Sequence, residues 1–175
     1  MMRNFISRLT ALIIFAGVLF SAAGCGYHVG FMKHPQIDSL AVAPAVNETA
    51  IYNVASDMRF MMTEAIQQDG TYKLSDQRRA DAIIYLIVKE AAFAEISDAS
   101  IEDNNRYRPG EWSAKVKVDY RVIIPGRGEP LLQGSVTGNA FFQAPGDLES
   151  ARLRAVRQAC HVAAQKIVYN IAEGW

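Results

Sequence analysis

The chain has 175 residues, of which 50% are hydrophobic and 21% are charged, with two cysteines. This composition is typical of one globular domain and excludes a disordered chain or a disulfide scaffold. The 18 basic and 18 acidic side chains balance, which argues against a nucleic-acid partner, because such binding needs an excess of Lys and Arg on one face.

The first 24 residues have the pattern of a secretory signal. Arg3 and Arg8 precede an apolar run from Leu9 to Ala23, and no acidic residue occurs among them. Fifteen residues span only ~22 Å as a helix, whereas a hydrocarbon core is about 30 Å thick. We therefore expect residues 1–24 to be cleaved rather than to remain as a transmembrane helix.

Small residues then lead directly into a cysteine, in the segment Ser21-Ala22-Ala23-Gly24-Cys25. This segment resembles a bacterial lipobox, which implies a diacylglyceryl group on the Cys25 sulfur, cleavage before Cys25 and acylation of its new amine. An ordinary secretory peptide is the alternative, but it does not require a cysteine. Two or more acyl chains hold a protein firmly on a membrane, so residues 25–36 are expected to be a lipidated tether.

A strand and a helix are predicted next. Alternation from Ile37 to Val46 predicts a strand, with Pro44 at its end or at a sheet edge. Asn53 is the expected N-cap of a helix that ends at Asp69, before a Gly70 stop. Its apolar stripe favours core packing over a copper or cofactor site, and it consists of Val54, Met58, Met61, Met62 and Ala65.

After a short extended piece at Thr71 to Ser75, the stretch from Ala80 to Val88 opens a strand that we expect to continue to Ile96. The first half of this strand is apolar on both faces. One sheet face of a two-layer domain normally meets water, so a loop, the tether or a partner must cover the second apolar face. The two opposing sets are Ile83, Tyr85 and Ile87, and Ile84, Leu86 and Val88.

A polar loop from Ser97 to Glu111, without EF-hand spacing, precedes a predicted antiparallel hairpin. Trp112 to Ile124 alternates strictly, and the turn Gly126-Arg127-Gly128 leads into a second strand from Leu131 to Phe142. The first of these strands should turn one set of side chains to the core and the other outwards. The inward set is Ala114, Val116, Val118, Tyr120 and Val122, and the outward set is Lys115, Lys117, Asp119 and Arg121.

The chain ends in a predicted helix to about Ala172, with Asp147 or a neighbour as its cap. Its expected stripe is Leu153, Val156, Cys160, Ala163, Ile167 and Ile171, with Cys160 as a small buried hydrophobe. We therefore predict an α+β fold over residues 37–175, a two-layer sandwich with two helices packed on one face of a mostly antiparallel four-stranded sheet.

No pattern of catalytic or metal-binding residues stands out. No second histidine lies three or four residues from His28, His34 or His161. Cys160 and His161 are adjacent and point about 100° apart on a helix, so they do not form a nucleophile–base pair. An enzyme, a metal site and a cofactor are therefore not expected, and a periplasmic hydrolase would need a polar cluster that the sequence does not contain.

The segment Gly24-Cys25-Gly26-Tyr27-His28 resembles the mature N-terminus of the LptE family of lipopolysaccharide-assembly lipoproteins. Residues 37–44, 47–49 and 79–83 are similar to its first strand, following turn and the beginning of its central strand. The resemblance implies a plug inside the LptD barrel that helps deliver lipopolysaccharide to the outer leaflet. Gly26 in place of Asp implies an outer-membrane location, on the periplasmic face. The chain departs from the family at 97–111, which does not align, and in lacking a basic residue after His28.

Lipopolysaccharide would require cations for the phosphates of lipid A. The candidates are Lys115, Lys117 and Arg121 on one strand face, with Arg106, Arg108 and Arg127 at the ends of the same hairpin. The alternative is a solvated polar face, partly neutralised by Asp119 and Glu111 or paired with acids of the barrel. The alternative function is an envelope lipoprotein that activates a cell-wall synthase or forms part of a secretion pore, in which a similar strand–turn–helix opening occurs.

Overall fold

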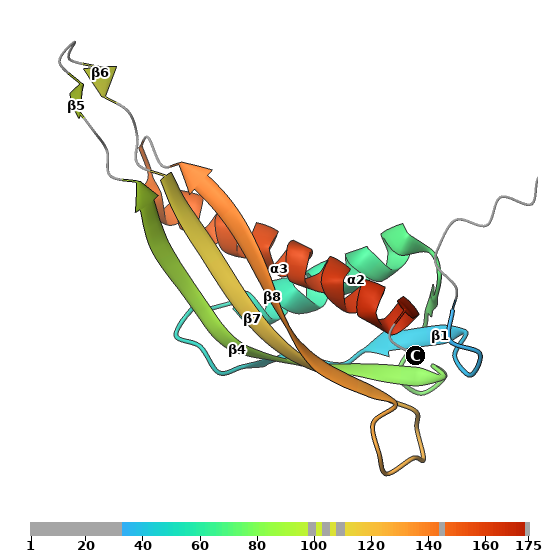
Figure 1. Cartoon of the computed structure of the whole chain (residues 1–175). Coiled ribbons are helices and arrows are strands. Elements are labelled where there is room, and N and C mark those ends of the chain that lie inside the picture. Colours follow the sequence, from blue (N-terminus) through green and yellow to red (C-terminus); the bar gives the residue numbers. More distant parts are fainter. Residues whose placement is uncertain (1–32, 98–100, 103–105, 108–110, 144–145, 174–175) are drawn as a thin grey trace, which may run out of the picture.

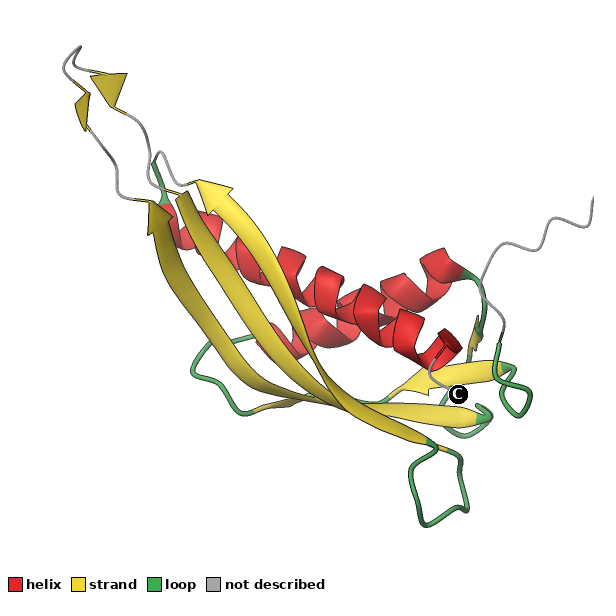
Figure 2. Cartoon of the chain, viewed as in Figure 1, coloured by secondary structure: helices red, strands yellow, loops and turns green. Residues whose placement is uncertain are grey.

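The computed structural model describes residues 33–97, 101–102, 106–107, 111–143 and 146–173. The predicted signal peptide, Cys25 and Arg108 lie outside these residues. Within them the chain forms two helices and eight strands (Figures 1 and 2). In chain order these are β1 (Ser39–Val42), β2 (Val46–Asn47), α2 (Val54–Asp69), β3 (Lys73–Leu74), β4 (Ala82–Ser97), β5 (Ile101–Glu102), β6 (Arg106–Tyr107), β7 (Glu111–Ile123), β8 (Leu132–Gln143) and α3 (Leu148–Glu173).

The sheet is mixed and has six strands, which corrects the prediction of a mostly antiparallel four-stranded sheet. Its order is β3-β1-β4-β7-β8, with β2 also paired to β4. β1 runs parallel to both β3 and β4, and β2 runs parallel to β4. The reason is α2, because a helix between two neighbouring strands returns the chain to the starting side and makes those strands parallel. The predicted antiparallel pairing holds for β4, β7 and β8.

The first predicted strand is shorter than expected and differs in burial. Alternation predicted one strand to Val46, but β1 ends at Val42, and Val46 lies in the separate β2 with 53% of its surface exposed. Leu40, Ala41 and Val42 are all buried. β1 is therefore covered on both faces, which is typical of a strand within a parallel arrangement.

α2 begins and ends where the sequence predicted. Asn53 is the N-cap residue in a left-handed conformation (φ 65°), although its side chain makes no capping hydrogen bond. Gly70 closes the helix with φ 73°, and its N–H donates to the Ile66 carbonyl. The whole predicted stripe, including its three methionines, is buried in the core.

α3 begins at the predicted cap, and its predicted buried stripe is confirmed except at Leu153. The Asp147 carboxylate accepts hydrogen bonds from the backbone N–H groups of Glu149 and Ser150, at 3.1 and 3.3 Å. Leu153, predicted to lie in the core, is 58% exposed. The other five residues of the stripe are buried, and the buried face also includes several alanines, namely Ala151, Ala155, Ala159 and Ala164.

These alanines allow α3 to approach β8 closely. A Cβ atom on Gly138 of β8 would lie 1.9 Å from the Ala159 carbonyl oxygen and 2.8 Å from the Ala163 nitrogen. Only a residue without a side chain fits there. The contact sets the distance between the helix layer and the sheet.

β4, β7 and β8 continue past the rest of the sheet, and the pair of short strands β5 and β6, here called the arm, lies beyond their ends (Figure 1). The predicted polar loop at 97–111 contains a short antiparallel pair there, β5 with β6, in which Ile101 pairs with Tyr107. At the base of this region the Arg152 guanidinium of α3 lies 5.2 Å from the Phe93 ring centroid and 5.7 Å from that of Trp112. These cation–π contacts hold the start of α3 against the long strands.

Candidate functional site

The outer face of the sheet, opposite the helices, is the first candidate site. On β4 the inward set Ile84, Leu86 and Val88 is almost completely buried, at 1% exposure or less. The opposing set therefore faces away from the helices. Within it Tyr85 is 39% exposed, while Ile83 and Ile87 are half-buried. The surface predicted to need a cover is thus the one that carries Tyr85.

The register of β4 and β7 places charged groups beside this apolar set. Tyr85 pairs with Arg121, and Ile87 pairs with Asp119. The outer face carries a depression of about 650 Å³ at this place. It is lined by Tyr85, Ile87, Lys89, Asp119, Tyr120, Arg121, Gln133, Gly134 and Ser135. An amphipathic ligand or partner could therefore meet both apolar and charged side chains here.

The three candidate cations of β7 lie where the sequence placed them. Lys115, Lys117 and Arg121 are all exposed on the outer face. Lys115 Nζ lies 3.5 Å from a Glu90 carboxylate oxygen. Lys117 and Arg121 form no ion pair with any residue that the structure describes. Since Glu90 and Asp119 lie among the cations, the face is of mixed charge.

A further ion pair lies beside this depression. Lys89 Nζ donates a 2.7 Å hydrogen bond to the Glu48 carboxylate. This bond raises the pKa of Lys89 above its ordinary value. Lys89 is therefore a fixed cation at the edge of the depression, and the sequence pattern did not identify it.

Of the remaining candidate arginines, Arg127 lies apart from Lys115 and Lys117. Arg127 lies in the turn at the end of β7 that leads into β8, where its Nη1 donates a 3.1 Å hydrogen bond to the side chain of Gln36. Arg106 belongs to β6, and Arg108 lies outside the described residues.

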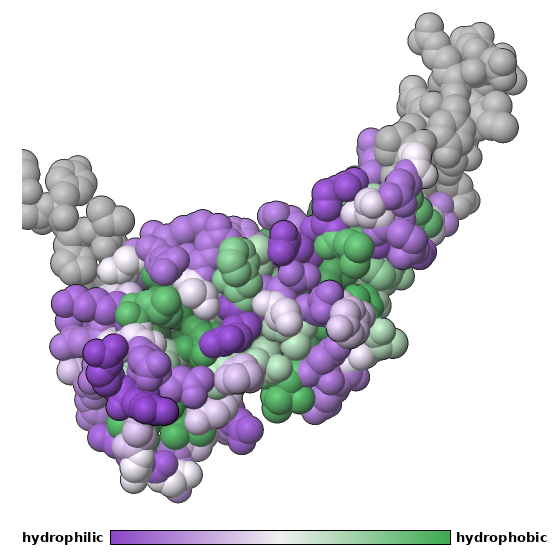
Figure 3. Space-filling view, turned by 180° about the vertical axis from the view of Figure 1, so that it is seen from behind, coloured by the Kyte–Doolittle hydropathy of each residue, from purple (hydrophilic) through white to green (hydrophobic). Residues whose placement is uncertain are grey.

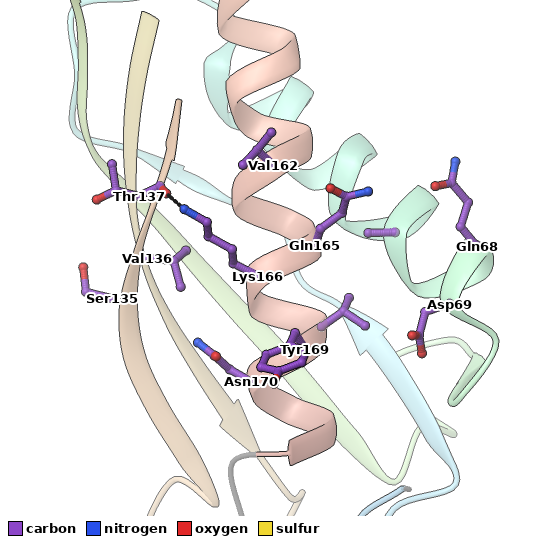
Figure 4. A pocket seen from close by; sticks show the side chains of 12 residues that line it. Gln68, Asp69, Ser135, Val136, Thr137, Val162, Gln165, Lys166, Tyr169 and Asn170 are labelled. Atoms are coloured by element: carbon purple, nitrogen blue, oxygen red, sulfur yellow. Dashed lines mark hydrogen bonds between the residues drawn. The ribbon is translucent and has the colours of Figure 1, made fainter. Parts of the chain in front are cut away.

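A second candidate site is a groove of about 760 Å³ along α3, and sequence reasoning did not find it. Figure 4 shows Ser135, Val136 and Thr137 of β8 on one side, with Lys166 and Asn170 of α3 pointing towards them. Lys166 Nζ donates a 2.7 Å hydrogen bond to the Thr137 carbonyl. The groove continues across α3 to Ala65, Gln68 and Asp69 of α2. No local motif signals this site, because its two walls are far apart in the sequence.

Exposed apolar side chains are scattered over the surface. Figure 3, which shows the molecule from behind the view of Figure 1, has several separate apolar patches, one of them near the base of the arm. Large exposed hydrophobic side chains occur on several elements, among them Tyr52, Phe60, Ile96, Phe141 and Leu153. On that view no single continuous apolar surface stands out.

Cys160 is buried in the core, and desolvation raises the pKa of its thiol to about 12. The described residues include no group of three or more metal-ligating side chains. Among the described helices, none is both long and apolar enough to cross a membrane.

The chain was compared with known proteins. No family model matches it, and no curated protein matches its sequence. Its fold is similar to that of a Xanthomonas campestris protein of the DUF330 family, with a TM-score of 0.53, 11% identity and coverage of 84% of this chain and 93% of that one. It is also similar to a candidate lipoprotein of Caulobacter crescentus, with a TM-score of 0.50, 15% identity and coverage of 74% of this chain and 88% of that one. A minor lipoprotein of Acinetobacter baumannii has a TM-score of 0.50 and 12% identity, with coverage of 79% of this chain and 94% of that one. These likenesses establish a shared bacterial fold.

Proposed function

We propose that this chain is an outer-membrane lipoprotein of the lipopolysaccharide translocon, anchored through Cys25 on the periplasmic face. In this role it is the plug and assembly partner of an LptD-like β-barrel and helps to deliver lipopolysaccharide to the outer leaflet. The proposal assigns the chain binding and assembly, with no catalytic step. Its anchor is supported by the lipobox-like segment before Cys25 and by a fold similar to those of a candidate and a minor lipoprotein.

The observation that carries the proposal is the outer face of the sheet. Tyr85 is partly exposed there beside Ile83 and Ile87, although the two helices already enclose a full core on the other face. Lys117 and Arg121 lie next to this apolar set and have no acidic partner among the described residues. A barrel wall and a phosphorylated lipid both have the chemistry to contact such a face.

Copurification of the barrel from native membranes tests the partner. Tyr85→Asp should reduce the amount of barrel recovered while leaving the domain folded, because Tyr85 lies outside the core. Tyr52→Asp is the matched control, since Tyr52 is 84% exposed and lies in the connection before α2 rather than on a strand of the outer face. Recovery of a penicillin-binding protein or a homo-oligomeric ring in place of a barrel would instead support the alternative envelope function.

Lipopolysaccharide binding is tested separately. Replacing Lys115, Lys117 and Arg121 together by Gln should reduce binding of purified lipopolysaccharide, whereas surface charges contribute little to folding. The control triple replacement removes as many exposed cations elsewhere, at Arg59, Lys73 and Arg78. Full binding by the first triple variant would remove lipopolysaccharide recognition from the proposed role of this face, and equal loss in both would make it a net-charge effect.

A further inference from the structure

The edge of β8 that faces away from β7 has no partner strand among the described residues. β8 is the last strand in the order of the sheet and is 12 residues long. A free edge invites pairing with another chain, and natural proteins usually guard it with charged residues, proline or a bulge. The sequence of β8, LQGSVTGNAFFQ, contains no charge and no proline, and its pairing with β7 has no bulge. The edge is therefore long and has no guard within the sequence of β8 itself.

Hydrogen bonds elsewhere in the sheet identify which β8 groups point outwards. The Ala43 N–H donates to the Ile84 carbonyl at 3.0 Å, so even-numbered residues in this part of β4 face β1 and odd-numbered ones face β7. In this part of the register of β4 with β7, odd-numbered residues of β4 pair with odd-numbered residues of β7, so the even-numbered residues of β7 direct their backbone groups to β8. These pair with even-numbered residues of β8. The odd-numbered residues Ser135, Thr137 and Asn139 then have their N–H and C=O groups at the free edge. The Lys166 hydrogen bond to the Thr137 carbonyl agrees with this assignment.

Cations approach this edge from both sides of the sheet. On the helix side, Lys166 reaches the edge itself (Figure 4). On the outer side, Lys115 pairs in register with Asn139, Lys117 with Thr137 and Arg121 with Gln133. The intervening β8 side chains are short or uncharged. Asp119, which pairs with Ser135, lies between Lys117 and Arg121. A strand added beside β8 would therefore meet one cation on the helix side, and three cations and one acid on the outer side.

We propose that the free edge of β8 is a docking site for an extended acidic segment of a partner protein, which pairs with it as an additional strand. Main-chain groups of Ser135, Thr137 and Asn139 supply the hydrogen bonds. Lys166 leaves the Thr137 carbonyl and pairs with a carboxylate of the incoming strand. The proposal goes beyond the proposed function, since it requires neither a barrel nor lipopolysaccharide.

The charges exclude a second copy of this chain and its own tether as the strand that pairs with β8. A second copy pairing through β8 would bring no acid, since β8 has none, and pairing about Thr137 would bring two Lys166 side chains together. The predicted tether of this chain, residues 25–36, also contains no acid. The described chain begins at Lys33, next to β1, and β7 and β4 separate β1 from β8. An acidic partner strand is the occupant that the surrounding cations favour.

A fluorescent peptide of alternating Glu and Val, capped by Thr at both ends, tests the proposal with the lipidated full chain in detergent. Anisotropy at low salt should show that this peptide binds at least about tenfold more tightly than its Gln counterpart. Asn139→Pro removes an outward N–H without removing a bond to β7, and should weaken binding about tenfold. Asn139→Ala, which keeps that N–H, is the matched control. Lys166→Gln should weaken binding of the Glu peptide but not of the Gln peptide.

Hydrogen exchange supplies a second measurement that needs no proline variant. Addition of the Glu peptide should slow exchange at Ser135 and Asn139 and leave amides of α2 unchanged. Equal affinity of the Glu and Gln peptides, equal affinity of folded Asn139→Pro and Asn139→Ala, or absence of protection at the edge would each overturn the proposal. So would sedimentation showing a dimer that Asn139→Pro dissociates. Because all these measurements use the isolated protein, failure here leaves the Tyr85 copurification test untouched.

Discussion

Replacement of Gly138 by alanine should disrupt the packing of α3 on β8. We expect it to be more damaging than a glycine-to-alanine replacement at any other described glycine. The new Cβ would lie 1.9 Å from the Ala159 carbonyl oxygen, about 1.5 Å short of ordinary contact. The obstacle is helix backbone, which a change of rotamer cannot move. α3 would have to shift away from the sheet, and Cys160 and Ile167 lie on the same buried helix.

The expected loss follows from the cost of overpacking. Inserted methyl groups in tight cores cost about 1–3 kcal/mol, and a forced backbone displacement belongs at the upper end, so we expect about 3 kcal/mol. For a domain of this size that corresponds to a decrease of roughly 6–12 °C in Tm. Urea unfolding followed by circular dichroism gives the free energy of unfolding directly.

Gly128→Ala is the matched control. It makes the same chemical change in the β7–β8 turn, where a Cβ would meet nothing within 4 Å. Its effect should stay within about 0.5 kcal/mol. If Gly138→Ala were as stable as the wild type, the close approach of α3 to β8 would not be a feature of the folded protein.

Three other outcomes follow from single side chains. The Asp81 carboxylate accepts hydrogen bonds from the Ser39 hydroxyl and N–H, which lower its pKa. Asp81→Ala should therefore destabilise the protein at pH 7. The difference from wild type in urea unfolding should begin to shrink as the pH falls below about 4 and should shrink further as the pH falls through the lowered pKa of the folded state. Burial raises the pKa of Cys160 to about 12. Iodoacetamide at pH 8 should therefore label Cys160 in urea but not in the folded protein, as measured by mass spectrometry. Rapid labelling of the folded protein would contradict this prediction. Cys25→Ala should remain uncleaved and should not incorporate labelled palmitate, whereas a variant that is still cleaved and labelled would disprove lipidation at Cys25.

Local patterns predicted those features that depend on neighbouring residues. The alternation of β7 identified which side chains face the core, and all five inward residues are buried. Gly70 and Asp147 were identified as helix boundaries because capping depends on one or two side chains. The parallel pairing of β1 with β4 was not predicted, because an apolar run does not state which strand lies beside it.

The buried stripe of α3 was predicted correctly except at its first residue. Val156, Cys160, Ala163, Ile167 and Ile171 are buried, whereas Leu153 is 58% exposed. A small residue such as Ala159 permits close approach to a sheet, but the helical period does not tell which strand residue it meets, and that residue is Gly138. The relevant pair is separated by more than 20 positions in the sequence, and only the folded chain brings them together.

The free edge of β8 shows what a hydrophobic pattern omits. Such a pattern reports which face of a strand is buried, since faces differ in their side chains. The edge of a strand presents only backbone N–H and C=O groups, and these are the same for every residue except proline. The lack of charge in β8 becomes informative only once the strand order places β8 last in the sheet. In a central strand the same residues would need no protection against pairing with another chain, because both edges would already be paired. Lys166 and Lys117 would then lie beside a paired edge rather than a free one.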